Sequence, residues 1–389
     1  MRISSALALA AAHCIAPATL HAAQGVDRDS VRFVQIAPLE GVGAAWGTGM
    51  RLGLLAAFEE ANRQGGVHGR RIRLDSHCDS NDPAHAVERM ESIIAADDHF
   101  ALIGTVGATV SRTLQPLASS AGMALVGAAT GDEALRAPWA TNVINIRPTD
   151  AAEIRALARH LADTHGTERI GVLHENDEEG RALLRTVEAA LAARGLEPVA
   201  KSSYAHGTTA IKVALLTIRR ASPDAVLMLG GHDAAAEFIK LAESLDFAPV
   251  FAGLSDTDAL ALGAELGDAA DGVLVAGAVP DPWDETWGVV ADYRSALTDH
   301  DRTAEPGFAS LEGYIAGRLA LAALDEAGPW LDRAGFLAAL GRLGELDLGG
   351  LELAYGAGDN QGLDDAFLIR LGADGTFETL PPATADGDN

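Results

Sequence analysis

The stretch from residue 31 to residue 69 decides the fold. It reads VRFVQIA (residues 31–37), then PLEGVGAAWG (residues 38–47), and it ends in GGVHG (residues 65–69). The apolar run predicts a buried strand, and the residues between the loop and GGVHG predict a helix. Two glycines and an aromatic residue at the mouth of a strand give a loop whose backbone can approach a small ligand closely. The segment therefore predicts a strand, a ligand-binding loop and a helix in succession.

The first residues of the chain have the features of an export signal. Arg2 precedes two short apolar runs, and Ala22 and Ala23 offer a cleavage site. Cys14 is a candidate lipoprotein cysteine, but His13 is a poor residue before a lipidated cysteine, so we expect no lipid anchor. We predict that residues 1–23 are a cleaved signal peptide and that the mature chain is a soluble exported protein. Its one remaining cysteine is Cys78, and such a thiol is usually buried.

Composition limits the partners of the mature chain. The formal net charge is −26, from 55 acidic and 29 basic residues. Such an acidic balance argues against nucleic acid and against anionic membrane surfaces as partners. About 365 residues remain after signal removal, which is more than one core usually holds, so two lobes are expected.

Strands and helices alternate along most of the chain, which predicts a doubly wound α/β architecture. The rhythm breaks at residues 146–150 and again at residues 278–283. We therefore predict one lobe from residues 24–147 plus 283–350, a second from residues 148–282 plus 351–380, and a disordered tail at residues 381–389. The expected strands are residues 31–37, 71–76, 101–103, 124–127, 170–174, 197–203, 225–229, 250–252 and 272–275.

The chain resembles the type I periplasmic binding proteins, in particular the leucine/isoleucine/valine-binding branch that serves ABC importers. The resemblance covers about residues 31–377. It rests on residues 38–47, 58–70, 103–107, 127–135 and 347–351. It implies two doubly wound parallel-sheet lobes, joined by crossover hinge strands, that close on a small solute and present it to a membrane permease.

In the first lobe, the resemblance implies four ligand-binding residues. Trp46 matches an aromatic residue that lies against the ligand, and an indole also offers a cation–π surface. Thr109 matches a hydroxyl near the ligand carboxylate, although an N-cap at Thr109 is an equally good use of that side chain. Ala128 and Thr130 match a segment that holds α-amino and α-carboxylate groups through backbone and hydroxyl contacts.

In the second lobe, the chain departs from the family pattern. Glu179 and His232 stand where aromatic residues are common, and the family's ammonium-binding acid falls near Ser255. Asp256 is a candidate substitute, although a shift of one residue usually turns a side chain away. The acidic run at residues 175–179 is either a solvated loop or part of a pocket for a polar or cationic solute.

Other site types fit less well. His77, Cys78, Asp79, Asp82 and His85 match no standard zinc spacing, and Asp82 before Pro83 is typical of a helix start. The glycines of residues 41–47, with Asp75 on the next strand, imitate a dinucleotide-binding loop, but Trp46 would crowd a pyrophosphate. We therefore predict no metal, no cofactor and no enzymatic activity.

The sequence thus predicts a monomeric periplasmic solute-binding protein of an ABC importer. Its expected ligand is an amino acid or a similarly small polar solute, and its expected partner is an ABC permease in the inner membrane. Two alternatives stay open: a ligand-binding component of a periplasmic sensor system, and an exported NAD-dependent oxidoreductase.

Overall fold

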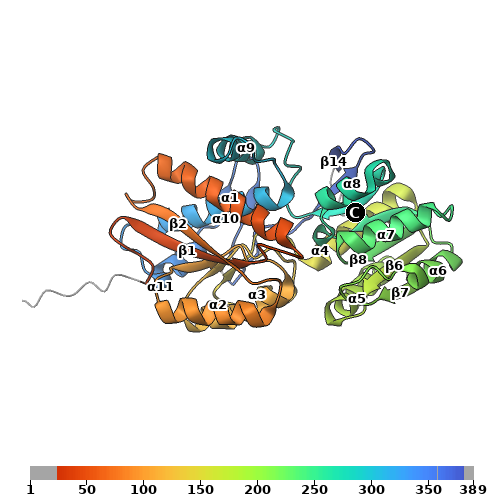
Figure 1. Ribbon diagram of the computed structural model, residues 1–389, viewed down its shortest axis with the longest axis horizontal. Helices are drawn as coiled ribbons and strands as arrows, with labels where there is room; N and C mark the ends of the chain where they lie inside the picture. The colour runs from red at the N-terminus through yellow and green to blue at the C-terminus, as the bar shows by residue number, and fades with distance from the viewer. Residues whose placement is uncertain (1–23, 357, 381–389) are drawn as a thin grey trace, which may run out of the picture.

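The computed structural model describes residues 24–356 and 358–380. The predicted signal peptide and the predicted C-terminal tail lie outside these residues. Figure 1 shows two α/β lobes side by side, each built around its own sheet. Within the described ranges, no helix combines the length and the apolar character that crossing a membrane requires.

The first lobe is built on five parallel strands in the order β2-β1-β3-β4-β5. Side chains of β1 are buried on both faces of the sheet, as expected for a parallel strand covered by helices on both sides. The strands are β1 (Ser30–Ala37), β2 (Arg71–Cys78), β3 (Ala101–Ile103), β4 (Leu125–Val126) and β5 (Val143–Ile144).

Helices from both ends of the chain cover this sheet. The early ones are α1 (Ala44–Arg63), α2 (Pro83–Ala96) and α3 (Ala108–Ser120), with the short helix η1 (Glu133–Arg136). The late ones are α9 (Gly288–His300), α10 (Phe308–Ala327) and α11 (Arg333–Leu340). The helices α1 and α10 pack in close contact because Gly53 and Gly313 lie at their crossing. A Cβ atom on Gly53 would lie 1.8 Å from the Ser310 carbonyl oxygen, and one on Gly313 would lie 2.2 Å from that of Met50.

The second lobe is built on seven strands in the order β14-β13-β10-β9-β8-β6-β7. Only β13 and β14 run antiparallel to their neighbours. The strands are β6 (Ile170–Glu175), β7 (Ala200–Tyr204), β8 (Ala225–Leu229), β9 (Val250–Gly253), β10 (Leu274–Gly277), β13 (Phe367–Leu371) and β14 (Phe377–Leu380). The helices are α4 (Asp150–His165), α5 (Glu178–Ala192), α6 (Lys212–Arg220), α7 (His232–Glu243) and α8 (Ala259–Leu266), with the short helices η2 (Ser255–Thr257) and η3 (Gly267–Ala270).

The chain passes between the lobes near both predicted breaks and again before β13. At this third passage, residues 360–363 run beside residues 145–146. The Asn145 N–H donates to the Asn360 carbonyl over 2.8 Å, and the Leu363 N–H donates to that of Ile146 over 3.0 Å. The small ribbon of β11 (Glu345–Asp347) and β12 (Glu352–Ala354) precedes it. Two of the segments that join the lobes therefore support each other.

The predicted fold class is confirmed, and all nine predicted strands overlap strands of the structure. The prediction missed β5 and the strands β11 to β14. The first of these has only two residues, and the others follow a helical segment where a repeating βα pattern gave no reason to expect antiparallel strands.

Candidate functional site

The loop after β1 places Trp46 at the start of α1. Gly43 caps the helix in the left-handed conformation with a φ of 79°. Because glycine has no Cβ atom, the chain turns there without strain. Gly47 brings the first helical turn against the loop, because a Cβ atom there would lie 1.9 Å from the Pro38 carbonyl oxygen. The half-buried Trp46 ring lies over Arg147, with the guanidinium carbon 5.1 Å from the ring centroid.

Arg147 is the centre of a polar network that joins both lobes. It lies in the crossing segment after β5, and its side chain is 1% exposed. Its Nε and Nη2 atoms donate to the two carboxylate oxygens of Glu312 on α10, over 2.9 and 2.7 Å. Its Nη1 atom donates to Ser255 Oγ over 3.1 Å and to Asp256 Oδ1 over 3.0 Å. One buried cation therefore contacts a first-lobe helix and the second-lobe loop after β9.

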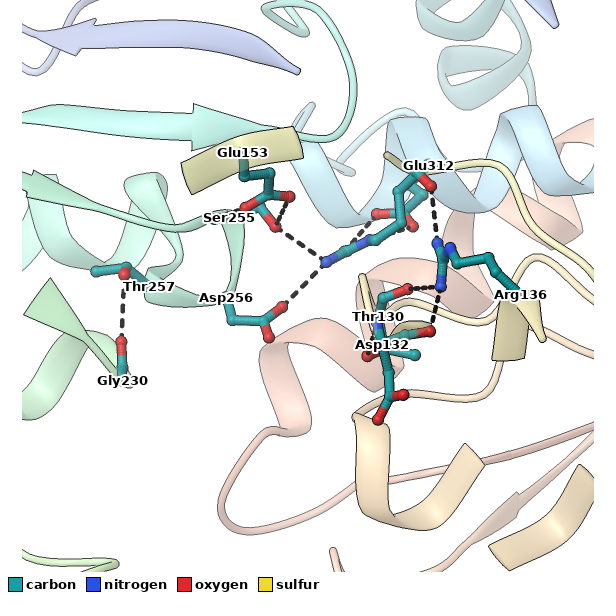
Figure 2. A network of polar contacts seen from close by, with 10 residues as sticks. Thr130, Asp132, Arg136, Glu153, Gly230, Ser255, Asp256, Thr257 and Glu312 are labelled. Carbon is teal, nitrogen blue, oxygen red and sulfur yellow. Dashed lines mark hydrogen bonds and ion pairs between the residues drawn. The ribbon is translucent and has the colours of Figure 1, made fainter. Parts of the chain in front are cut away.

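The neighbouring carboxylates affect the pKa of Arg147 more than its burial does. Burial alone lowers the pKa of Arg147, but Glu312, and then Asp256, raise it above the ordinary value. Figure 2 shows Glu153, Ser255 and Asp256 on one side of the network, and Glu312, Arg136 and Thr130 on the other. Removing one partner of a buried ion pair leaves an uncompensated charge. Because the partners of Arg147 come from both lobes, the network couples the packing of the two lobes.

Acidic groups from the second lobe are in excess near Arg147. The buried Glu153, in the first turn of α4, accepts hydrogen bonds from the Ser255 N–H over 2.9 Å and from the Ser255 hydroxyl over 2.7 Å. Burial, and then the charge of Asp256, raise the pKa of Glu153 to about 7. Burial and the same Asp256 charge raise the pKa of Asp150 well above its usual range.

Glu179 belongs to the same electrostatic neighbourhood. It lies half-buried in the first turn of α5, after β6. Burial, and then Asp256, raise the pKa of Glu179 to about 7, and Arg112 from the first lobe acts in the opposite direction. The side chain therefore senses groups of both lobes, and negative charge in this region is not fully compensated.

In the first lobe, by contrast, acidic and basic side chains balance each other's charge. The buried Thr130 accepts a hydrogen bond from the Asp132 N–H over 3.2 Å, and its carbonyl accepts one from Arg136 over 3.1 Å. Asp132 forms an ion pair with Arg112 over 3.2 Å. Burial lowers the pKa of Arg136 to about 10, which is still far above neutral pH, so this side chain stays cationic. Ala128 is buried, and its carbonyl accepts the Thr130 N–H over 2.9 Å.

Thr109 and His232 lie apart from the Arg147 network. Thr109 is exposed in the first turn of α3, and the N-cap of that helix is Gly107, so the N-cap predicted at Thr109 was wrong. The left-handed φ of 82° at Gly107 explains why glycine occupies the cap. His232 begins α7, and its Nε2 atom lies 3.0 Å from Asp233 Oδ1, within the second lobe.

The segment with metal-ligand residue types after β2 is a helix start. Asp82 caps α2 by accepting the Ala84 N–H over 2.8 Å, and Pro83 is the first helical residue, as predicted. Cys78 is half-buried and not fully buried as expected. Its sulfur accepts the N–H groups of Leu39 and Ser80, each over 3.4 Å, because the loop after β1 runs beside the end of β2.

The sequence prediction did not find Arg147 or Glu312. A signal for both was present, since Glu312 is the only charged residue among the first ten of the apolar helix α10, and Arg147 follows a buried strand segment. A charge at such a buried position needs a partner of opposite sign. Pairing the two required knowing that α10 returns to the first lobe.

The comparisons with known proteins agree with this architecture. A family model described as periplasmic binding protein matches residues 30–376. The chain belongs to the periplasmic binding protein family. Members of this family are solute-binding proteins and not enzymes, which argues against the oxidoreductase interpretation of the loop at residues 41–47.

Two curated relatives are similar to this periplasmic binding protein. Leu/Ile/Val-binding protein homolog 3 of Brucella melitensis is 27% identical over 78% of this chain and 81% of its own length. Leu/Ile/Val-binding protein BraC3 of Rhizobium johnstonii is 23% identical, and the match spans 61% of this chain and 65% of that relative.

Two solved structures have closely similar folds. A possible leucine/isoleucine/valine-binding protein from Rhodopirellula baltica is 29% identical, with a TM-score of 0.84 over 92% of this chain and 98% of its own. A fatty acid ABC transporter substrate-binding protein from Thermomonospora curvata also has a TM-score of 0.84, over 92% of this chain and 93% of its own, at 18% identity. Because similar folds carry such different ligand names, the fold alone does not identify the solute.

Proposed function

We propose that this periplasmic binding protein is the solute-binding component of an ABC importer and that it captures an amino acid or a similar small polar solute by hinge closure. The observation that carries the proposal is the Arg147 network, in which residues of both lobes meet at the hinge. A solute that contacts both lobes at once stabilises the closed arrangement only.

In this proposal, the first lobe holds the solute through Trp46, Thr109, Ala128 and Thr130. The Thr130 hydroxyl accepts the Asp132 N–H, and its own proton has no acceptor among the described residues, so it can donate to a carboxylate or carbonyl. A hydrogen bond to a charged group contributes about 1.5–3 kcal/mol. The second lobe closes over the solute with Glu179, His232 and Asp256.

The charge of the second lobe favours a solute with a cationic group. Glu153 and Glu179 both have a pKa raised to about 7, which indicates that more positive charge would be favourable near them. Asp256 is half exposed and gives only its Oδ1 atom to Arg147, so its second oxygen is free to accept from an ammonium group. An α-amino acid, a small amine or an amide fits these groups better than a fatty acid does.

The cavity beside the Arg147 network is too small for the proposed solute. A cavity of about 20 Å³ between the lobes is lined by Trp46, Ser255 and Glu312, with apolar residues of β10 and α10. Such a volume holds about one water molecule and no amino acid. A solute of that size therefore needs space between the lobes outside this cavity, or a movement of the lobes that enlarges it.

The test is a thermal-shift screen of the mature chain against amino acids, amides, polyamines and fatty acids, followed by calorimetry on the hits. A ligand of the native state stabilises it by mass action, by about 2.7 kcal/mol at a hundredfold excess over Kd. The melting temperature rises as a result. An amino acid or small cation is the expected hit. A fatty acid as the only hit, or turnover of any compound, would contradict the proposal.

Export and delivery are tested separately. We expect the protein in the periplasmic fraction, with its N-terminus near residue 24 and without a lipid. We also expect the protein to be a monomer. Uptake of the solute should require both this protein and its permease. Recovery from the cytoplasm with the N-terminus intact would refute the export step.

A further inference from the structure

Outside the Arg147 network, three side chains of the second lobe point their ligand atoms at one place. His206 Nδ1 lies 2.6 Å from Glu175 Oε2 and 2.9 Å from Asp177 Oδ2. Glu175 ends β6, Asp177 precedes α5, and His206 follows β7. We propose that Glu175, Asp177 and His206 form a binding site for a divalent transition-metal ion of the zinc class.

The residue types favour zinc over magnesium or calcium. One imidazole nitrogen and two carboxylate oxygens are ligands that zinc accepts, whereas magnesium and calcium prefer oxygen ligands alone. Zinc ligand atoms lie about 2.0–2.2 Å from the metal, so neighbouring ligand atoms of a tetrahedral site lie about 3.3–3.6 Å apart. The separations of 2.6 and 2.9 Å would have to widen by roughly 0.4–1 Å to admit an ion, and the 71% exposed His206 side chain has the freedom to move by that much. All described ligand atoms of the cluster lie within 4.8 Å of one another.

The two carboxylates are held in place by other groups, as ligands of metal sites usually are. Glu175 uses Oε1 to accept the Tyr204 hydroxyl over 3.2 Å, which leaves Oε2 turned to His206. Asp177 uses Oδ1 to accept the Gly180 N–H over 2.7 Å, which leaves Oδ2 turned the same way. Each carboxylate therefore has one oxygen fixed by the fold and one directed at the shared position.

The fold also makes room for this support. Glu175 and Tyr204 are paired residues on the neighbouring strands β6 and β7. Gly230, after β8, admits the Tyr204 hydroxyl, because a Cβ atom on Gly230 would lie 2.1 Å from that oxygen. The carboxylates are half-buried, at 21% and 28% side-chain exposure, while His206 is 71% exposed.

Three protein ligands leave at least one coordination position for water or for a donor atom of a solute. All three ligands come from the second lobe, so the site does not require the lobes to close. The other interpretation is an ion-pair triad, in which a protonated His206 lies between two carboxylates without any metal. The two interpretations differ in a measurable way, because only the first predicts specific zinc binding.

The experiment is calorimetric titration of the untagged, chelator-treated mature protein with Zn²⁺ at pH 7.5, with Mg²⁺ in a parallel run. We expect one Zn²⁺ site that Mg²⁺ does not occupy. His206→Gln should weaken it by at least about tenfold, since loss of a single ligand has at least the effect of losing a supporting group. Asp177→Asn should also weaken it, although the amide oxygen can still cap α5.

His300→Gln is the matched control. His300 Nδ1 lies 2.8 Å from Glu59 Oε2, so it is also a histidine beside a carboxylate, but it has only one such partner and lies in the first lobe. We expect this variant to bind Zn²⁺ as the wild type does. No saturable Zn²⁺ binding by the wild type, or equal affinity of wild type and His206→Gln, would overturn the metal site and leave the ion-pair triad.

Discussion

The two lobes present different charge where they meet. In the first lobe, Asp132 is paired with Arg112, and Glu312 is paired with Arg147 from the crossing segment. In the second lobe, Glu153 accepts hydrogen bonds from Ser255 and keeps a raised pKa despite the nearby charge of Arg147, and Glu179 has no ion-pair partner among the described residues. The comparison sharpens the proposal: if the solute binds between the lobes, the charge-balanced first lobe would accept polar solutes of either charge, and the acidic second lobe would favour a cationic one.

The largest effect on stability should come from a substitution in the first lobe, where acidic groups have basic partners. Glu312→Ala leaves the buried Arg147 without its main partner, and breaking a buried ion pair in this way costs about 3–5 kcal/mol. Chemical denaturation should therefore show a large loss of stability. Glu326→Ala on the same helix is the control, because its pairing with Arg342 over 3.4 Å is exposed, and we expect less than about 1 kcal/mol there. Equal losses would refute the central role of Arg147.

The acidic side should make stability depend on pH in an unusual direction. The pKa of Glu153 rises from 4.5 to about 7 on folding. A raised pKa means that the folded state binds the proton more tightly, so stability is present below pH 4.5 and is lost as pH rises through about 7.

The matching measurement is the denaturation free energy at pH 5 and pH 8 for the wild type and Glu153→Gln. Each pKa unit corresponds to 1.36 kcal/mol, so the wild type should lose about 1–3 kcal/mol more than the variant between these pH values. Comparing the two proteins cancels the contributions of other titrating groups. An identical pH dependence would mean that Glu153 is not held protonated by its surroundings.

In the first lobe, Thr130→Ala should weaken solute binding by about tenfold, which corresponds to one lost hydrogen bond to a charged group. The fold should survive, because the Thr130 hydroxyl accepts only the Asp132 N–H. Thr113→Ala is the control, since its hydroxyl donates to the Thr109 carbonyl on the exposed face of the same lobe. Calorimetry with the solute from the screen measures both, and unchanged affinity of Thr130→Ala would remove that residue from the site.

The smallest expected effect is a difference in affinity between cationic and neutral solutes. Glu179→Gln should weaken a cationic solute a few-fold more than a neutral one, because the screened attraction of one carboxylate amounts to about 1 kcal/mol. Glu178→Gln, in the same helical turn but exposed, should weaken both equally or not at all. Equal losses for Glu179→Gln would favour the solvated-loop interpretation of residues 175–179.

Most of the fold could be predicted from local pattern. The run at residues 31–37 forms β1, and the Gly-rich loop after it starts α1, because apolar periodicity and glycine conformations act over a few residues. The two-residue strand β5 was missed because its pairing with β4 has no local signal.

The site was harder to predict because its partners are far apart in sequence. Arg147, Asp256 and Glu312 come from three segments that meet only because the chain crosses between the lobes and α10 returns to the first lobe. Asp256 was a candidate substitute for the family's acid, although a shift of one residue usually turns a side chain away. The short helix η2 instead lets both Ser255 and Asp256 contact Arg147. Whether Glu179, His232 and Asp256 contact the solute stays a prediction.

The most direct test of the account is small-angle X-ray scattering by the mature protein with and without the solute from the screen. The account predicts that saturating solute reduces the radius of gyration, as two hinged lobes close around one molecule. Tight binding with no change in the scattering profile, at solute concentrations that saturate the calorimetric signal, would contradict it.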